Sequence, residues 1–161
     1  MSEKHIASWN AQAASNFVYA YGKLSQLKVA PAAPASLRQL LRATVRVADG
    51  MNAQEVANSL WAFAKLGLDL GPAHEPLIQA TVRVADSMNA QAVSNVCWAV
   101  GTLRVEMGGA RGPLLQQVPR VSAAFKAMHR TQIAIGLDWL EEQCSSRSDM
   151  RRAWKSIEKT I

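Results

Sequence analysis

The sequence contains little of the chemistry that catalytic centres and disulfide-stabilised folds require. Its 161 residues include three scattered histidines and two cysteines, Cys97 and Cys144. Neither cysteine has the spacing of a metal site, so we predict two small core residues in a reducing compartment. A His-Glu-x-x-His pair, a nucleophile elbow and a P-loop are all missing. We therefore predict a protein that is not an enzyme and that uses no metal, cofactor or small-molecule substrate.

Long apolar segments and strand patterns are also missing. No apolar run approaches the roughly 18 residues that a transmembrane helix needs. The N-terminal sequence MSEKHIASWN lacks the apolar core of a secretory signal and the Arg-rich amphipathic pattern of a transit peptide. The sequence thus predicts an all-α chain that does not span a membrane, and it gives no targeting information of its own.

The charge is biased toward one sign. Lys and Arg number 18 against 12 Asp and Glu, and the pI is near 9.8. Such a balance makes RNA, DNA and anionic membranes the natural partners to consider. A hydrophobic content of 49% argues against disorder, and a length of 161 residues suits a single domain.

What the sequence has in abundance is internal repetition. MNAQEVANSLWA at residues 51–62 returns as MNAQAVSNVCWA at residues 88–99, with eight of twelve letters identical. ATVRVAD, at residues 43–49, returns 37 residues later. Two weaker copies of the first segment lie at residues 9–20 and at Gln132–Trp139. Self-similarity at a period of about 20 to 50 residues indicates a stacked repeat fold.

Each unit has the pattern of two helices. Asn52 and Glu55 have the spacing of a capping box, Asn89 is the corresponding N-cap, and Gly67 is placed to end the helix. Helical hairpins of this length cannot bury an apolar face alone, so they stack. We predict an α-solenoid of about four helix-turn-helix units with a period near 37 residues, forming one domain over residues 1–161. The predicted units are 9–50, 51–87, 88–127 and 128–161. The basic amphipathic helix near the C-terminus has the composition of a membrane-surface helix, but we expect stacking to bury its apolar side instead.

Polar and aromatic residues recur on one side of the first helix of each unit. At about 100° per residue, Gln54, Asn58 and Trp61 fall within a narrow sector together with Lys65. Their counterparts are Gln12, Asn16, Tyr19 and Lys23 in the first unit, Gln91, Asn95 and Trp98 in the third, and Trp139 in the last. Amides can pair with base edges, aromatic rings can stack on bases, and lysines can meet phosphates. This stripe therefore has the composition of a single-stranded RNA reader.

The same stripe also has a structural interpretation. In a stacked fold each helix touches the neighbouring units, and large aromatic residues are mostly buried. We therefore favour packing over base stacking for Trp61 and Trp98. Two interpretations stay open for Asn58 and Asn95, namely contact with bases and hydrogen bonding between adjacent helices.

A basic stripe follows the second helices. Arg38, Arg42 and Arg46 recur at intervals of four on the side opposite the apolar residues, and Arg83 continues that stripe in the next unit. Like charges stacked in this way repel one another and gain most by meeting phosphates, although a solvated surface also explains a basic stripe. All four arginines are candidate phosphate contacts.

The segment NAQEVANSLWAFAKLG, at residues 52–67, resembles the repeat signature of octotricopeptide repeat proteins and their heptatricopeptide and RAP-domain relatives. The resemblance extends over roughly residues 9–140 and is closest in the two central copies. It implies a superhelix of paired helices that binds single-stranded RNA or ribosomal RNA in mitochondria or chloroplasts. Transcript maturation, stability, translation or a place in an organellar ribosome are the implied roles, with other proteins of an organellar ribonucleoprotein as partners. Thr102 departs from the pattern, since it replaces the lysine of the other units.

Two functional hypotheses follow. The leading one is a non-enzymatic RNA-binding repeat protein, in which the first-helix amides face bases and the nearby lysines and arginines contact phosphates. The alternative is a protein–protein interaction scaffold of the same fold, in which the repeated Asn and Trp are structural and the basic surface meets an acidic protein.

Overall fold

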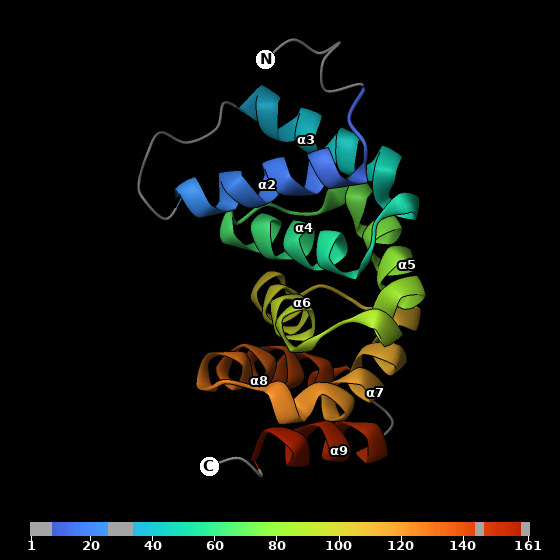
Figure 1. The fold of residues 1–161 in the computed structure, drawn as a ribbon, viewed down its shortest axis with the longest axis vertical. Coiled ribbons are helices and arrows are strands. Elements are labelled where there is room, and N and C mark those ends of the chain that lie inside the picture. The colour runs from blue at the N-terminus through green and yellow to red at the C-terminus, as the bar shows by residue number, and fades with distance from the viewer. Residues whose placement is uncertain (1–7, 26–33, 144–146, 159–161) are drawn as a thin grey trace.

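The computed structural model describes residues 8–25, 34–143 and 147–158, and this part of the chain is all-helical, without strands (Figure 1). The α-helices are α2 (Ala11–Ser25), α3 (Pro34–Val47), α4 (Ala53–Lys65), α5 (His74–Val84), α6 (Ala90–Leu103), α7 (Arg111–Val121), α8 (Ala127–Glu142) and α9 (Arg147–Glu158). Short 3-10 turns lie between them, at Ala48–Gly50, Gly71–Ala73, Ala85–Ser87, Gly108–Ala110 and Ser122–Ala124.

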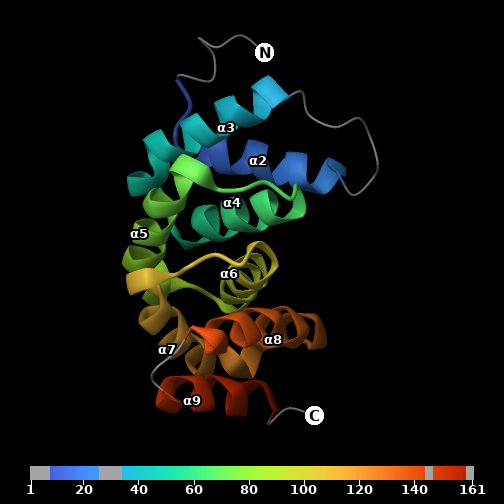
Figure 2. The same ribbon diagram turned by 180° about the vertical axis from the view of Figure 1, so that it is seen from behind.

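The helices alternate between two rows. In the main row, α2 packs on α4, α4 on α6 and α6 on α8, so that helices far apart in the sequence follow one another along the long axis (Figure 1). The view from behind shows α5 and α7 along one side of this row and α9 next to α8 at the C-terminal end (Figure 2). Each predicted unit contributes one helix to the main row and one to the side, which gives the fold a repeat-like order.

Capping residues determine where the main-row helices begin and end. The Asn52 side chain accepts a hydrogen bond from the Glu55 amide at 3.0 Å, and the Glu55 carboxylate accepts one from the Asn52 amide at 2.9 Å. Asn89 caps α6 in the same way by accepting from the Ala92 amide at 2.9 Å. After α4, Gly67 adopts a φ of 62°, a conformation that glycine tolerates best. The predicted caps and stop signal are therefore confirmed.

The core lies between the two rows. Val56, Leu60 and Phe63, the predicted apolar side of α4, are fully buried. Cys97 is also buried, as predicted, and its burial raises the pKa of the thiol to about 12. Cys144 lies outside the described residues. The apolar side of the described part of the last helix, α9, is buried too, as expected from stacking.

Glycines allow α6 and α8 to approach unusually closely. A Cβ atom on Gly101 of α6 would lie 2.3 Å from the carbonyl oxygen of Ile135, and one on Gly136 of α8 would lie 2.4 Å from that of Cys97. Such distances are well inside van der Waals contact, so only glycine fits at either position. One unit earlier, at the α4–α6 contact, the corresponding residues are Ala64 and Ala99.

In three units, a long polar side chain on the second helix donates a hydrogen bond to a backbone carbonyl oxygen just before the first helix of the same unit. Arg46 donates to the carbonyl oxygen of Trp9 at 3.1 Å. Arg83 donates to that of Met51 at 2.8 Å, and Gln117 of the next unit donates to that of Met88 at 2.7 Å. Arg83 also donates to the Ala48 carbonyl oxygen at 3.1 Å, and thus reaches the preceding unit.

The fourth copy of the stripe has a different register from the predicted one. The N-caps of α4, α6 and α8 are Asn52, Asn89 and Lys126, at equal intervals along the chain. Counting from these caps, Gln132 takes the place of Asn58 and Asn95. The seven-residue spacing from Gln to Trp predicts instead that Gln132 corresponds to Gln54 and Gln91. Trp139 consequently takes the place of Lys65 and not that of Trp61. The prediction was wrong because it followed the Gln and Trp letters and the cap of α8 is not an asparagine.

Candidate nucleic-acid interface

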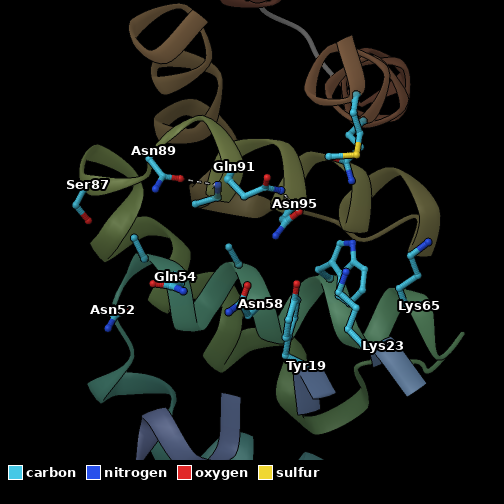
Figure 3. A pocket seen from close by; sticks show the side chains of 16 residues that line it. Tyr19, Lys23, Asn52, Gln54, Asn58, Lys65, Ser87, Asn89, Gln91 and Asn95 are labelled. Carbon is cyan, nitrogen blue, oxygen red and sulfur yellow. Dashed lines mark hydrogen bonds between the residues drawn. The ribbon is translucent and has the colours of Figure 1, made fainter. Parts of the chain in front are cut away.

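A groove of about 910 Å³ opens on the main row, mainly between α4 and α6 (Figure 3). We call it the α4–α6 groove. Six of the predicted candidates line it, namely Lys23, Gln54, Asn58, Lys65, Gln91 and Asn95. No Asp or Glu is among the described residues that line it. The groove therefore combines amide side chains with uncompensated positive charge.

The amide side chains on the α4 side of the groove make no hydrogen bonds within the described part of the chain. Gln54 is exposed and Asn58 is half-buried. Neither side chain makes a hydrogen bond to any residue in the described part of the chain. Each amide therefore retains a donor group and an acceptor group for a ligand in the groove.

The amide side chains on the α6 side of the groove are hydrogen-bonded to protein groups. Gln91 donates from Nε2 to Oδ1 of Asn95 at 2.9 Å, and its own Oε1 lies 3.1 Å from Nε2 of His129 on α8. Nδ1 of His129 accepts from the amide of Lys126 at 3.3 Å, so the neutral ring carries its proton on Nε2 and donates it to Gln91. Asn95 is only 5% exposed. This chain of hydrogen bonds ties α6 to α8.

Toward α8 the groove changes character. Met128 lines this end and is 59% exposed. Gln132 also lines it, but its side-chain oxygen is buried without a hydrogen-bond partner among the described residues. A buried acceptor without a partner is costly, so this end of the groove is not optimised for stability.

The aromatic residues of the stripe pack on one another along the main row. The ring centroids of Tyr19 and Trp61 are 5.0 Å apart, and those of Trp61 and Trp98 are 6.3 Å apart. Trp61 is only 6% exposed, whereas Tyr19 and Trp98 are half-buried. We call these three rings the aromatic ladder. Because Trp61 is covered on both sides, it packs between units, as the structural interpretation favoured.

Two lysines cover the aromatic ladder. Nζ of Lys23 lies 5.5 Å from the Tyr19 ring centroid and 5.1 Å from that of Trp61. Nζ of Lys65 lies 5.6 Å from the Trp61 centroid and 4.5 Å from that of Trp98. Each ammonium group thus faces two rings, an attraction worth about 0.5–1 kcal/mol at exposed sites. Neither lysine forms an ion pair with a carboxylate in the described residues, so both charges are held at the groove and face solvent.

Trp139 and Arg104 make a related contact at the α6–α8 end. The guanidinium carbon of Arg104 lies 5.4 Å from the Trp139 ring centroid, and the Trp139 ring donates from Nε1 to the Val105 carbonyl oxygen at 2.9 Å. Arg104 has a φ of 53° and occupies the place that Gly67 has one unit earlier. The sequence analysis missed Arg104, and only its position after the α6 helix could have drawn attention to it.

The remaining candidates lie away from the groove. Gln12 and Asn16 are exposed on α2. Arg38 and Arg42 are exposed on α3, on the side row. Arg46 and Arg83 donate to backbone carbonyl oxygens, as described above, so their guanidinium groups have a structural role. The structure thus brings together the lysines and four of the six amides of the stripe, and leaves Gln12, Asn16 and the arginines outside the groove.

Other kinds of site find no support in the residues that the structure describes. Within them, no group of three or more His, Cys, Asp or Glu side chains is arranged to hold a metal ion. The described helices are also too short or too polar to cross a bilayer. No protein-family model, curated protein or solved structure matches the chain.

Proposed function

We propose that the chain is an α-solenoid of four helical hairpins that binds single-stranded RNA in the α4–α6 groove, without enzymatic activity. The observation that carries this proposal is the convergence of two amides without hydrogen bonds to the described residues, Gln54 and Asn58, and two lysines on one groove whose described lining holds no acidic residue. Equal intervals between the N-caps of α4, α6 and α8 support the solenoid with its period of 37 residues.

In this proposal the lysines contact phosphates and the amides contact bases. Lys23 and Lys65 neutralise phosphates, which gives affinity, a steep dependence on salt and little discrimination between sequences. Amides such as Gln54 and Asn58 offer both a donor and an acceptor, so they can distinguish base edges in an unpaired strand. The edges of bases in an RNA duplex are not accessible in this way, so the proposal requires a single strand.

The resemblance to octotricopeptide repeat proteins supports the same function. By that resemblance, the proposed setting is a mitochondrion or chloroplast, where the protein would act in transcript maturation, stability or translation, or contact ribosomal RNA. A few repeats read only a few nucleotides, since helical-repeat readers recognise about one base per repeat. Cooperation with ribosomal RNA or with another protein of the ribonucleoprotein is then part of the proposal.

A competition experiment tests this function. The purified protein is titrated into labelled single-stranded RNA at two salt concentrations, with duplex RNA, single-stranded DNA and an acidic protein as competitors. We expect single-stranded RNA to compete best, and to keep its advantage at the higher salt concentration. Equal competition by all polyanions, lost together as salt is raised, would contradict the proposal.

One observation favours the alternative, a protein-interaction scaffold. Met128 and Ile135 of α8 are 59% and 39% exposed, which is unusual for large apolar residues on one helix. A partner protein could cover them. In the same titration, this function predicts that the acidic protein displaces the RNA and that single-stranded RNA has no advantage over other polyanions.

A further inference from the structure

The two best-preserved copies of the stripe have the same letters but different surroundings. Gln54 and Asn58 on α4 have no hydrogen-bond partner among the described residues. In the next copy, Gln91 and Asn95 are bonded to each other and, through Gln91, to His129. We propose that the α4 copy forms a subsite for one nucleotide and that the α6 copy positions α8. This inference rests on the proposed RNA-binding function.

The α4 copy has the contacts that one nucleotide needs. The amides of Gln54 and Asn58 lie on the α4 side of the groove, opposite α6 (Figure 3). Farther along α4, the Lys65 ammonium is held over the rings of Trp61 and Trp98, and Lys23 reaches the same Trp61 ring from α2. A base edge can therefore meet the amides while the adjoining phosphate meets the two lysines. Trp61 takes no part in stacking on the base, because its ring is buried.

In the α6 copy the amide oxygens, which would supply the acceptor half of a two-bonded contact to a base, are already engaged. Oδ1 of Asn95 already accepts from Gln91, and Oε1 of Gln91 already accepts from His129. The lysine position of this copy is Thr102, so the phosphate contact is missing as well. For Asn95 to pair with a base through both its oxygen and its nitrogen, Oδ1 would have to exchange its hydrogen bond from Gln91 for one from the base. Such a replacement gains little net free energy, because one hydrogen bond is exchanged for another.

A matched pair of variants tests the subsite, Asn58→Ala and Asn95→Ala. Affinities of the wild type and both variants are measured for short single-stranded homopolymers of adenylate, cytidylate and uridylate. Asn58→Ala should reduce the preference of the wild type for its best homopolymer by about tenfold, as expected for losing a two-bonded contact to a base. Asn95→Ala should leave the preference unchanged, although it weakens the fold. If Asn95→Ala does not fold, Gln91→Ala serves in its place.

A third variant separates the phosphate contact from the base contact. Lys65→Met keeps the packing of the aliphatic stem on the rings but removes the charge. It should lower the slope of log affinity against log salt by about 0.7, the value for one phosphate on a single strand, and leave the homopolymer preference intact. An unchanged slope would remove Lys65 from the subsite.

The possible results distinguish the two proposals. If the wild type binds none of the homopolymers better than duplex RNA, the proposed function fails. If the wild type prefers single-stranded RNA, but has no base preference or responds alike to Asn58→Ala and Asn95→Ala, the function stands and the subsite is wrong. Loss of preference in Asn58→Ala alone supports both.

Discussion

The helix pairs α4–α6 and α6–α8 have similar sequences but pack differently. A groove lies between α4 and α6, which we call the open contact, whereas the backbones of α6 and α8 touch, which we call the closed contact. At the first, Ala64 and Ala99 lie where the second has Gly101 and Gly136. Those two glycines bring the backbones of α6 and α8 into direct contact. Gln54 and Asn58 line the α4–α6 groove without a hydrogen-bond partner among the described residues, whereas Gln91 is bonded to Asn95 and to His129 of α8.

The difference shows that a repeated polar residue does not have one fixed role. An amide needs a partner within about 3 Å, so both the distance between two helices and the side chain that the next helix presents decide whether it bonds to protein or stays available. Small residues set that distance, because they determine how closely the two backbones approach. Gln91 and Asn95 bond to each other within α6. Helix α8 offers His129 to Gln91 where α6 offers only Ala92 to α4, so the partner supplied by the next helix also determines what those side chains do.

Replacing glycine with alanine at the α6–α8 contact should have the largest effect on stability. A methyl group on Gly136 would collide with the Cys97 carbonyl, a backbone group that cannot move without shifting α6. We expect Gly136→Ala to lower the free energy of unfolding by about 3 kcal/mol or more, as in severe overpacking. Urea denaturation measures this, with Gly50→Ala as the control, since a methyl group at Gly50 meets nothing within 4 Å. A loss below about 1 kcal/mol would show that α6 and α8 can separate without penalty.

Removing the histidine that joins the two helices should have the next largest effect. His129→Ala removes a buried ring together with its hydrogen bonds to Gln91 and Lys126, which should lower the free energy of unfolding by about 1–3 kcal/mol. The matched change on the open side, Asn58→Ala, removes no hydrogen bond and should change stability by less than about 0.5 kcal/mol. Thermal unfolding of both variants provides the comparison. Equal losses in both would mean that the α4 amides are bonded in solution.

The sequence predicted the parts of this arrangement that depend on local pattern. The helix starts at Asn52 and Asn89 and the stop at Gly67 follow from capping chemistry, and the burial of Phe63 follows from helical periodicity. These features depend on neighbours within a few residues, which the sequence shows directly.

Contacts between residues far apart in the sequence could not be predicted from local pattern. His129 bonds to Gln91 across 38 positions, and no local pattern marks this pair. The same holds for the structural use of Arg83, whose spacing on its helix matched that of an exposed basic stripe. The register of α8 was misjudged because Lys126 replaces the expected asparagine cap. Where the letters diverge, only the stacking of the helices shows which positions correspond.

Arg83 donates hydrogen bonds to the Ala48 and Met51 carbonyl oxygens, a pair of contacts that we call the clamp, and these allow the comparison to be sharpened on the side row. Arg83→Ala removes two hydrogen bonds to carbonyl oxygens and should lower the free energy of unfolding by about 1.5 kcal/mol. Arg83→Gln should lose nearly as much, because Gln117, which bonds to Met88 in the next unit, stands at the position of Ala80 and therefore starts about one helical turn earlier. Chemical denaturation measures both, with the exposed Arg42→Ala as the control. If Arg83→Ala matched Arg42→Ala, the clamp would contribute nothing to stability.

The smallest effect concerns the thiol on the closed side, where Cys97 takes the place of Leu60. Burial raises the pKa of Cys97 from 9.0 to about 12, so between these values the unfolded chain has lost a proton that the native chain keeps. The free energy of unfolding therefore falls as pH rises through 9, by about 1.4 kcal/mol at one unit above it. Below pH 9 the thiol contributes no pH dependence, because it is protonated in both states. Urea denaturation at neutral and alkaline pH, compared with Cys97→Ala, isolates this contribution from that of other groups. The same alkaline loss in both proteins would show that Cys97 ionises in the folded chain and that the α6–α8 contact admits water.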